Sequence, residues 1–444
     1  MTSQQDLIQK ASLPRALWSL SWPLVLAHEI QQVVLTILVF WMGHLIGERG
    51  LAVESLFRPI ELMVFWFFLA PSIGASALVS RSVGAKDGRG FTILASMLTL
   101  NAVLLGGVII VAIPFSPYIA EVIGGPHAES MFRYLVPWIL LSLPGLALTE
   151  FVLGVIEATG STKFGLVRSA LDVCIMAGLV PLGMLGFGIA GAPIAVGIAS
   201  MGLFAVLLLT VVRRRAELGL GDPPKRFFHR DGAAWRQVMA VGLPVVGVRV
   251  TTFAAQVLML QGVGRESPTA AAGFGIAMLV MLYSSAVTMA VGQACSIIIG
   301  HCLGANLLDR AQRTVRTSVI TGLSVTAIFV IAISAVSDPV ILFLSNNAGV
   351  TDDATSAFSI MRWGLFAVCT WQIALAALTA HKKTGRAGLL SVIADAISLA
   401  VFFWWPGSRL IAACVAFCVA AGLKAAVFMT LLSVLRVEPR IADE

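Results

Sequence analysis

Charged residues are scarce in this sequence. Only 12% of its 444 residues are Asp, Glu, Lys or Arg, whereas 58% are hydrophobic, and the mean hydropathy is +0.93. This balance excludes a soluble globular domain, in which about a quarter of the residues are charged. The six cysteines contain no Cys-x-x-Cys pair of the kind that binds metals, so we interpret them as small apolar packing residues.

Signatures of enzymes are missing as well. No Gly-x-x-x-x-Gly-Lys-Ser/Thr loop is present, so ATP hydrolysis by this chain is not expected. The fragment His28-Glu29-Ile30-Gln31-Gln32 resembles a zinc protease helix, but Gln32 stands where the second metal-binding histidine is required. We therefore expect no enzymatic activity, no metal site and no cofactor.

Long apolar segments dominate the chain instead. A bilayer core about 30 Å thick is spanned by about 20 apolar residues in a helix. Twelve segments reach this length and predict an all-α polytopic membrane protein with 12 transmembrane helices. The segments are Trp18–Ile46, Leu56–Val79, Ile93–Tyr118, Phe132–Ala158, Phe164–Leu185, Ile189–Val212, Trp235–Gly262, Ala270–Cys302, Thr314–Leu344, Ser356–Ala380, Gly385–Trp405 and Leu410–Leu435.

The basic residues predict how these helices are oriented. One set of alternate loops holds 18 of the 30 Lys and Arg residues, and the opposite loops hold 6. Because basic loops stay in the cytoplasm, both termini are expected to be cytoplasmic. The net charge of +7 follows from this bias and needs no nucleic-acid partner. We expect a multi-pass protein of a bacterial-type inner (plasma) membrane, monomeric and surrounded by lipid.

The two halves of the chain repeat each other. Pro23 opens one long apolar segment, and Pro244 opens another 221 residues later. Gly84 and Gly304, which are 220 residues apart, close the segments that follow. We expect the Gly-Ala turns that begin at these glycines to form tight helix C-termini.

This repeat predicts the domain organisation. Two six-helix lobes, residues 1–212 and 233–444, are expected to be joined by a cytoplasmic linker at residues 213–232. Many secondary transporters are duplicated bundles of this kind. We therefore predict two lobes that alternate between inward and outward openings of a V-shaped central cavity.

Further motifs occur at fixed places in this layout. Besides the two prolines, they are the turn Gly84-Ala85-Lys86-Asp87, its counterpart Gly292-Gln293…Gly304-Ala305-Asn306, and Gly188-Ile-Ala-Gly191 at the start of the sixth helix. Their order and spacing along nearly the whole chain resemble the MATE (multidrug and toxic compound extrusion) transporters. The resemblance implies an antiporter that exports organic compounds against an inward flow of protons or sodium.

The acids that this resemblance implies are absent. Typical members have an Asp fifteen residues after the first proline, where this chain has Leu38. Sodium-type members have a Glu eight residues after the second proline, where Thr252 stands, and an Asp in the tenth helix, whereas Ser356–Ala380 contains no acid. The coupling acids of the family therefore cannot be carried over. Because both sodium-type acids are missing, protons are favoured over sodium as the coupling ion.

Three acidic residues of the first lobe lie at membrane depth and are the candidates for ion coupling. Glu29 is about 16 Å, and Glu150 and Asp172 are about 12 Å, from the cytoplasmic ends of their helices. Charges at such depth are costly and usually functional. Carboxylates grouped in one layer repel each other, so at least one is expected to hold a proton near neutral pH, and the same oxygens could hold sodium.

Asp172 is the strongest of the three, because the fifth helix of the family carries polar groups that bind the coupling ion. The alternative for Asp172 is an ion pair with Arg168, one turn earlier. For Glu29, coupling and a buried pair with Arg168 stay equally open, and Gln31 shares the helix face of the missing first-helix acid. Glu150 is expected chiefly to anchor helices near the cytoplasmic gate.

The second lobe combines acidic and basic residues. Asp395 lies about 15 Å and Lys424 about 16 Å into sequential antiparallel helices, so their side chains can meet. A buried pair that stabilises the lobe is favoured over a functional pair. Arg249, five residues after Pro244, either attracts anionic or zwitterionic substrate groups or competes for Asp395.

A set of polar residues is predicted to line the substrate cavity. For its glutamines, the alternative is hydrogen bonding between helices. The set is Arg249, Gln31, Gln256, Asp395 and Gln293.

The sequence thus predicts a secondary active antiporter. We expect it to export drugs, toxins or natural products, and so to confer antibiotic resistance, in exchange for inward protons, with sodium as the alternative ion. An acidic first lobe and a mixed second lobe suit a zwitterion or a mixed amphiphile as substrate. The alternatives are a lipid-intermediate flippase, disfavoured by the twelve helices and few cavity cations, and a channel, disfavoured by the lack of a repeated pore motif.

Overall fold

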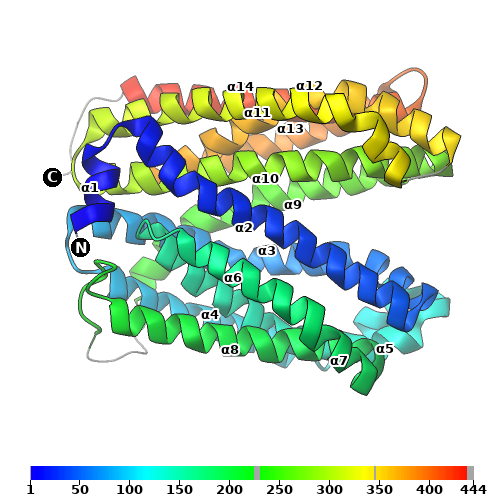
Figure 1. Cartoon of the computed structure of the whole chain (residues 1–444), viewed down its shortest axis with the longest axis horizontal. Coiled ribbons are helices and arrows are strands. Elements are labelled where there is room, and N and C mark those ends of the chain that lie inside the picture. Colours follow the sequence, from blue (N-terminus) through cyan, green and yellow to red (C-terminus); the bar gives the residue numbers. More distant parts are fainter. Residues whose placement is uncertain (1, 225–230, 345–346, 438–444) are drawn as a thin grey trace. The chain divides into compact units, whose positions relative to one another are not determined.

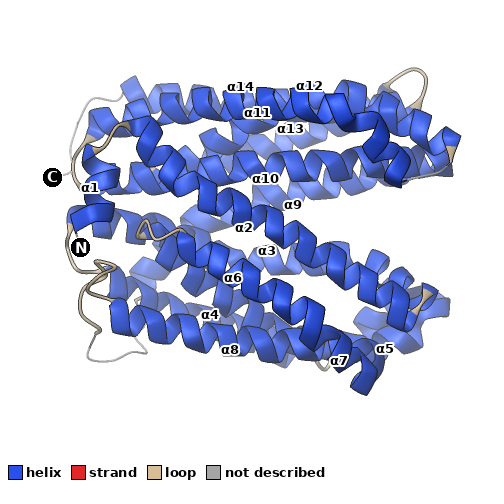
Figure 2. Cartoon of the chain, in the orientation of Figure 1, coloured by secondary structure: helices blue, strands red, loops and turns tan. Residues whose placement is uncertain are grey.

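The chain, described by a computed structural model, consists of helices joined by short connections (Figure 2). The structure describes residues 2–224, 231–344 and 347–437, without the side chains of residues 2–4, 48–64, 119–133, 336, 338, 340, 343, 344, 436 and 437. No strand occurs in this described part of the chain. The prediction of an all-α protein is confirmed.

The helices fall into two compact units (Figure 1). The first unit contains Met1–Lys10, Leu26–Leu243 and Leu303–Asn306, and the second contains Ala11–Val25, Pro244–Cys302 and Leu307–Glu444. The α-helices are α1 (Thr2–Lys10), α2 (Leu13–Trp41), α3 (Glu48–Ala85), α4 (Gly90–Ala112), α5 (Ser116–Ala158), α6 (Lys163–Cys174), α7 (Val180–Phe187), α8 (Gly191–Arg214), α9 (Gly232–Glu266), α10 (Pro268–Gly304), α11 (Leu308–Leu344), α12 (Ala348–Ala380), α13 (Gly385–Trp404) and α14 (Arg409–Val437).

Ten helical segments of the described residues are long and apolar enough to cross a membrane. The longest, Lys163–Arg214, contains both the fifth and the sixth predicted spans, because the helices from α6 to α8 follow one another directly. The second predicted span, Leu56–Val79, lies within α3, where the side chains of residues 48–64 are outside the described set. The ten segments and α3 together account for the twelve predicted spans.

Pro23 and Pro244 lie inside helices and not at their starts. Helix α2 begins at Leu13 and α9 begins at Gly232, several residues before the prolines. The predicted spans Trp18–Ile46 and Trp235–Gly262 also contain the two prolines, and the helices begin a few residues before those spans. The helical residues before each proline are less uniformly apolar, so an apolar pattern does not reveal them.

The repeated Gly-Ala turns end two helices in the same way. Lys86 and Asn306, which are 220 positions apart, both have a left-handed backbone, with φ of 57° and 58°. The N–H of Lys86 donates to the carbonyl of Val83, and the N–H of Asn306 donates to the carbonyl of Leu303, both at 3.3 Å. A left-handed residue after a helix lets such N–H groups reach its last carbonyls. The predicted role of these turns as helix C-termini is confirmed.

Two π-helical segments interrupt the α-helices. The segment η1 (Met42–Ile46) follows α2, and the N–H of Gly47 donates to the carbonyl of Met42, five residues earlier, at 3.1 Å. The segment η2 (Ile175–Leu179) separates α6 from α7. Pro181 in the first turn of α7 lacks the N–H that a continuous α-helix would use there, which accounts for the irregular turn before it.

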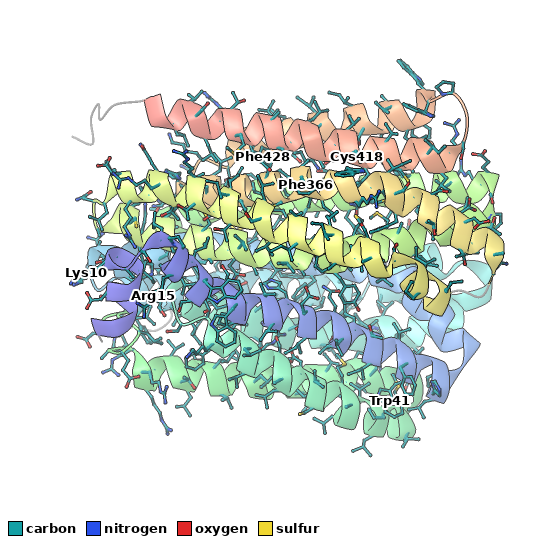
Figure 3. The ribbon with its side chains drawn as sticks, turned by 45° about the horizontal axis from the view of Figure 1, so that its top comes forward. Lys10, Arg15, Trp41, Phe366, Cys418 and Phe428 are labelled. Atoms are coloured by element: carbon teal, nitrogen blue, oxygen red, sulfur yellow. The ribbon has the colours of Figure 1, made fainter. Side chains whose placement is uncertain are left out.

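Close packing of α12 against α14 organises the second unit. Gly364 of α12 faces Phe417 and Cys418 of α14, and a Cβ at this position would press against both side chains. Further along α14, the buried ring of Phe428 packs edge-on against Trp371 of α12, with ring centroids 6.4 Å apart. Figure 3 labels Cys418 and Phe428 on α14. This packing fixes the position of Lys424, which lies between those two residues in sequence.

Candidate ion-coupling and substrate-binding sites

Arg168 of α6 is the centre of a charged cluster in the first unit. Its Nη1 lies 2.5 Å from Oε1 of Glu150 on α5, and its Nε lies 2.9 Å from Oδ2 of Asp172, one turn further along α6. Nη1 is also 3.4 Å from Oε1 of Gln31 on α2. Arg168 and Asp172 are each 8% exposed, so the protein shields these charges. We refer to Glu150, Arg168 and Asp172 as the N-terminal charge cluster.

Hydrogen bonds between helices hold this cluster in place. The hydroxyl of Ser169 donates to the carbonyl of Ala27 at 3.1 Å and joins α6 to α2. The hydroxyl of Thr149 donates to the carbonyl of Ser200 at 2.8 Å and joins α5 to α8. Ser169 and Thr149 are the sequence neighbours of Arg168 and Glu150, so these bonds fix the rotation of the helices that bring the charges together.

Glu157 adds a third carboxylate near Arg168 that we did not predict. It follows Glu150 by seven residues on α5, so the two lie on the same helix face two turns apart. Glu157 is 7% exposed, and its charge acts on Arg168. A Cβ at Gly165 would collide with its carboxylate, so the glycine leaves room for it. The seven-residue spacing from Glu150 is the feature of the sequence that points to Glu157. Glu157 is absent from the predicted site because it lies next to the end of the predicted span Phe132–Ala158, outside the layer of acids at membrane depth.

Glu29 lies apart from the N-terminal charge cluster. Its side chain is half-buried, and Oε1 is shielded without a hydrogen-bond donor among the described residues. The α2 residue that reaches Arg168 is Gln31, because two positions on a helix differ by about 200° in direction. The alternative in which Glu29 pairs with Arg168 is therefore wrong. A coupling role for Glu29 stays a prediction.

Asp395 and Lys424 form a buried ion pair in the second unit. Nζ of Lys424 on α14 lies 2.5 Å from Oδ1 of Asp395 on α13, and the two residues are 1% and 4% exposed. The contact predicted from their equal depth is confirmed. The hydroxyl of Thr251 donates to Oδ2 of Asp395 at 2.8 Å, and Nζ donates to Oγ1 of Thr252 at 2.5 Å. Nζ also lies 5.7 Å from the ring centroid of Trp371.

This network leaves both charges of the pair satisfied. Each oxygen of Asp395 accepts a hydrogen bond, and the ammonium has a carboxylate, a hydroxyl and an aromatic face around it. A buried pair with such partners stabilises a helix bundle and has no free coordination position to offer. The geometry therefore favours a structural role, as predicted.

Arg249 of α9 has no acidic partner among the described residues. Its Nη1 lies 3.4 Å from Sδ of Met289 on α10, and no carboxylate of the described side chains is within ion-pair distance of it. The alternative in which Arg249 competes for Asp395 is not what the structure shows, since Asp395 contacts Lys424 and two threonines.

The predicted glutamines have different surroundings. Gln31 contacts the N-terminal charge cluster. Gln256 is half-buried and lies seven residues after Arg249, on the same face of α9. Gln293 follows Met289 by one turn on α10 and is also half-buried. Their role in lining a substrate cavity stays a prediction. Within the described part of the chain, no three His, Cys, Asp or Glu side chains are arranged to hold a metal ion.

The sequence is similar to those of bacterial multidrug resistance proteins. The chain is 26% identical over 366 residues to "Probable multidrug resistance protein YoeA" of Bacillus subtilis (strain 168), with 78% of this chain and 77% of that protein covered. It is 25% identical over 336 residues to "Probable multidrug resistance protein NorM" of Mesorhizobium japonicum, with 71% and 69% covered.

Solved structures share the fold. The chain superposes on an outward-facing multidrug resistance MATE family transporter of the MOP superfamily with a TM-score of 0.89, covering 99% of this chain and 100% of that chain at 16% identity. A MATE in complex with MaL6 gives a TM-score of 0.87 at 17% identity, with the same coverage. At this identity the likeness shows the fold alone.

The family model for MatE matches the chain twice, over residues 23–182 and 244–404. The two matches begin at the two equivalent prolines, so the internal repeat inferred from the sequence is a repeat of the family unit. The matches cover more than half of the chain, and the chain therefore belongs to the MatE family.

Proposed function

We propose that this chain exports organic compounds in exchange for inward protons, with the N-terminal charge cluster as the proton-binding site. Export of drugs is supported by the relatives named as multidrug resistance proteins. Proton coupling is supported by the chemistry of the cluster. The chain would act in the plasma membrane, by alternating access of a substrate site to the two sides.

The balance of charges in the cluster carries the proposal. Glu150 and Asp172 both contact the single guanidinium of Arg168, and the charge of Glu157 acts on it as well, so carboxylates outnumber the cation in a shielded place. An uncompensated buried charge costs several kcal/mol. One proton on one of the carboxylates that contact Arg168 lowers this excess of negative charge by one. The cluster can thus exist in two states that differ by a single proton.

Asp172 is the residue that we assign to this proton. Glu150 has the shorter contact with Arg168, 2.5 Å against 2.9 Å for Asp172. Oδ2 of Asp172 and Nε of Arg168 are close but not aligned as a hydrogen bond. Neutralising Asp172 therefore gives up less interaction than neutralising Glu150.

The second unit supports a proton over sodium as the coupling ion. Its one acidic side chain in the middle of a described span, Asp395, already binds the ammonium of Lys424. A sodium ion bound to Asp395 would be repelled by the positive charge of that ammonium. Coupling would therefore rest on the first unit, where protonation biases the conformational equilibrium by differential affinity for its two states.

Transport in proteoliposomes tests the proposal. With an imposed proton gradient, Asp172→Asn is expected to lose proton-driven export of a fluorescent drug, because the amide cannot exchange a proton. The matched control is Glu266→Gln, which removes an exposed acid that accepts only a backbone hydrogen bond, from Arg409. Unchanged proton-driven export by Asp172→Asn would refute the assignment, and a gradient of sodium that drives export better than protons would refute proton coupling.

A further inference from the structure

Arg249 is a charged residue in the middle of a membrane span. It lies seventeen residues from Gly232 and seventeen from Glu266, which are the two ends of α9 and of the span. A cation at such depth is costly unless a charge partner or a water-filled space compensates it. The position of Arg249 therefore requires an explanation.

Two other cations at membrane depth, Arg168 and Lys424, have carboxylate partners. Arg168 has Glu150 and Asp172, and Lys424 has Asp395. The oxygens of Asp395 are occupied by Lys424 and Thr251, so this acid is not available to Arg249. A guanidinium that has no acid among the described residues differs from these structural pairs.

The one polar contact of Arg249 is weak. Its Nη1 approaches Sδ of Met289 at 3.4 Å, and thioether sulfur is a poor acceptor. A guanidinium has five N–H donors, and no described oxygen accepts from those of Arg249. Its N–H donors are therefore available to an acceptor other than the described residues.

The surroundings of Arg249 combine polar and polarisable side chains. Gln256 lies on the same face of α9 two turns on, and Gln293 lies one turn after Met289 on α10. Both glutamines are half-buried, as Arg249 is. Methionine adapts to ligands of irregular shape, and glutamine offers both donors and acceptors. Side chains of these kinds suit an amphiphilic organic molecule.

We propose that Arg249 binds the carboxylate of an anionic or zwitterionic organic substrate. The planar guanidinium matches a carboxylate with two parallel hydrogen bonds, and the pair neutralises the charge at the centre of the span. This inference rests on the proposed function as an exporter and specifies its substrate class. A lipid headgroup is a poor alternative partner, because headgroups lie about 15 Å from the middle of the bilayer.

Binding to the purified full chain in detergent tests this proposal without any gradient. The probes are a fluorescent rhodamine with a free carboxylate and its methyl ester, which differ only in that charge. Fluorescence anisotropy of the wild type is expected to show at least tenfold tighter binding of the carboxylate form. Arg249→Gln is expected to remove this preference and leave the affinity for the ester nearly unchanged. Arg249→Lys keeps the charge but not the paired donors, so an intermediate preference is expected.

The matched control is Arg362→Gln. Arg362 of α12 also lacks an acidic partner among the described residues, but it donates to the hydroxyl of Ser334 at 3.3 Å and lies over the ring of Trp363. This variant is expected to keep the preference for the carboxylate.

Two results would overturn the proposal. The first is equal binding of both probes by the wild type. This result does not depend on whether any variant folds. A preference that persists in Arg249→Gln or in Arg249→Lys at the full wild-type level is the other. Because the measurement is made at equilibrium in detergent, a failure of proton coupling in proteoliposomes would leave it unaffected, so the two proposals fail separately.

Discussion

The ammonium nitrogen of Lys424 lies 2.5 Å from Oδ1 of Asp395, and this contact joins α14 to α13 inside the second unit. The chain thus keeps one complete ion pair in its second half. In the first half, Arg168 is shared by two carboxylates. The charged group of the first half has an excess of carboxylates, whereas the pair of the second half is neutral, and this difference is a reason to expect different functions of the two halves.

Removing the charge of Lys424 is expected to destabilise the protein. Lys424→Met leaves Asp395 buried without a counter-charge, which lowers the free energy of unfolding by about 3–5 kcal/mol. Thermal unfolding in detergent measures this. The double variant Lys424→Met with Asp395→Asn removes both charges and should regain most of the loss. A single variant as stable as the wild type would show that the pair does not stabilise the fold.

The pH dependence of export should be set by Asp172. Its carboxylate must take up a proton from the side where protons enter, so export is expected to increase as the pH on that side falls. Asp172→Asn resembles a permanently protonated residue, and its residual transport should not depend on that pH. Initial rates of dye efflux at several external pH values check this. A variant that keeps the wild-type pH profile would place the proton elsewhere.

Gly242 and Gly247 on α9 offer a matched pair of substitutions. A Cβ at Gly242 would overlap the carbonyl of Ala70 on α3, whereas a Cβ at Gly247 would meet no described atom within 4 Å. Gly242→Ala is therefore expected to destabilise the protein by about 1–3 kcal/mol. Gly247→Ala should be neutral or stabilising by up to about 1 kcal/mol, because alanine is the better helix former. Equal unfolding temperatures of the two variants would contradict this close approach of α9 to α3.

The left-handed residue Asn306 can be tested in the same way. Its φ of 58° suits glycine and asparagine, and most other side chains disfavour it. Asn306→Ala is expected to cost about 1 kcal/mol, whereas Asn306→Gly should be neutral. Chemical denaturation of the purified variants measures the difference. If alanine were tolerated as well as glycine, the helix would have to end in another way.

Much of the fold was predictable because membrane helices are recognised by length and apolar composition. The turns at Lys86 and Asn306 repeat at a fixed spacing, and this made the duplication visible. Asp395 and Lys424 were paired correctly because they belong to sequential antiparallel helices, where depth alone decides which residues meet. The beginnings of α2 and α9 were missed because they precede the apolar pattern.

The N-terminal charge cluster could be predicted only in part. Depth placed Glu150 and Asp172 in one layer, and the helical spacing linked Asp172 to Arg168. Which face of α2 meets Arg168 depends on the rotation of that helix about its axis, and no sequence pattern reports this. In the structure, Gln31 contacts Arg168, and Glu29 lies apart from the N-terminal charge cluster.

The π-helical segment η1 marks a difference in length between the two copies. Pro23 and Pro244 are 221 positions apart, whereas Lys86 and Asn306 are 220 apart, so the first copy holds one residue more between its proline and its turn. That interval contains η1, while α9 continues as an α-helix to Glu266. A wide turn is how a helix absorbs a single inserted residue. The extra residue of the first copy therefore fits within η1, and the Gly-Ala turns that follow it end their helices in the same way in both copies.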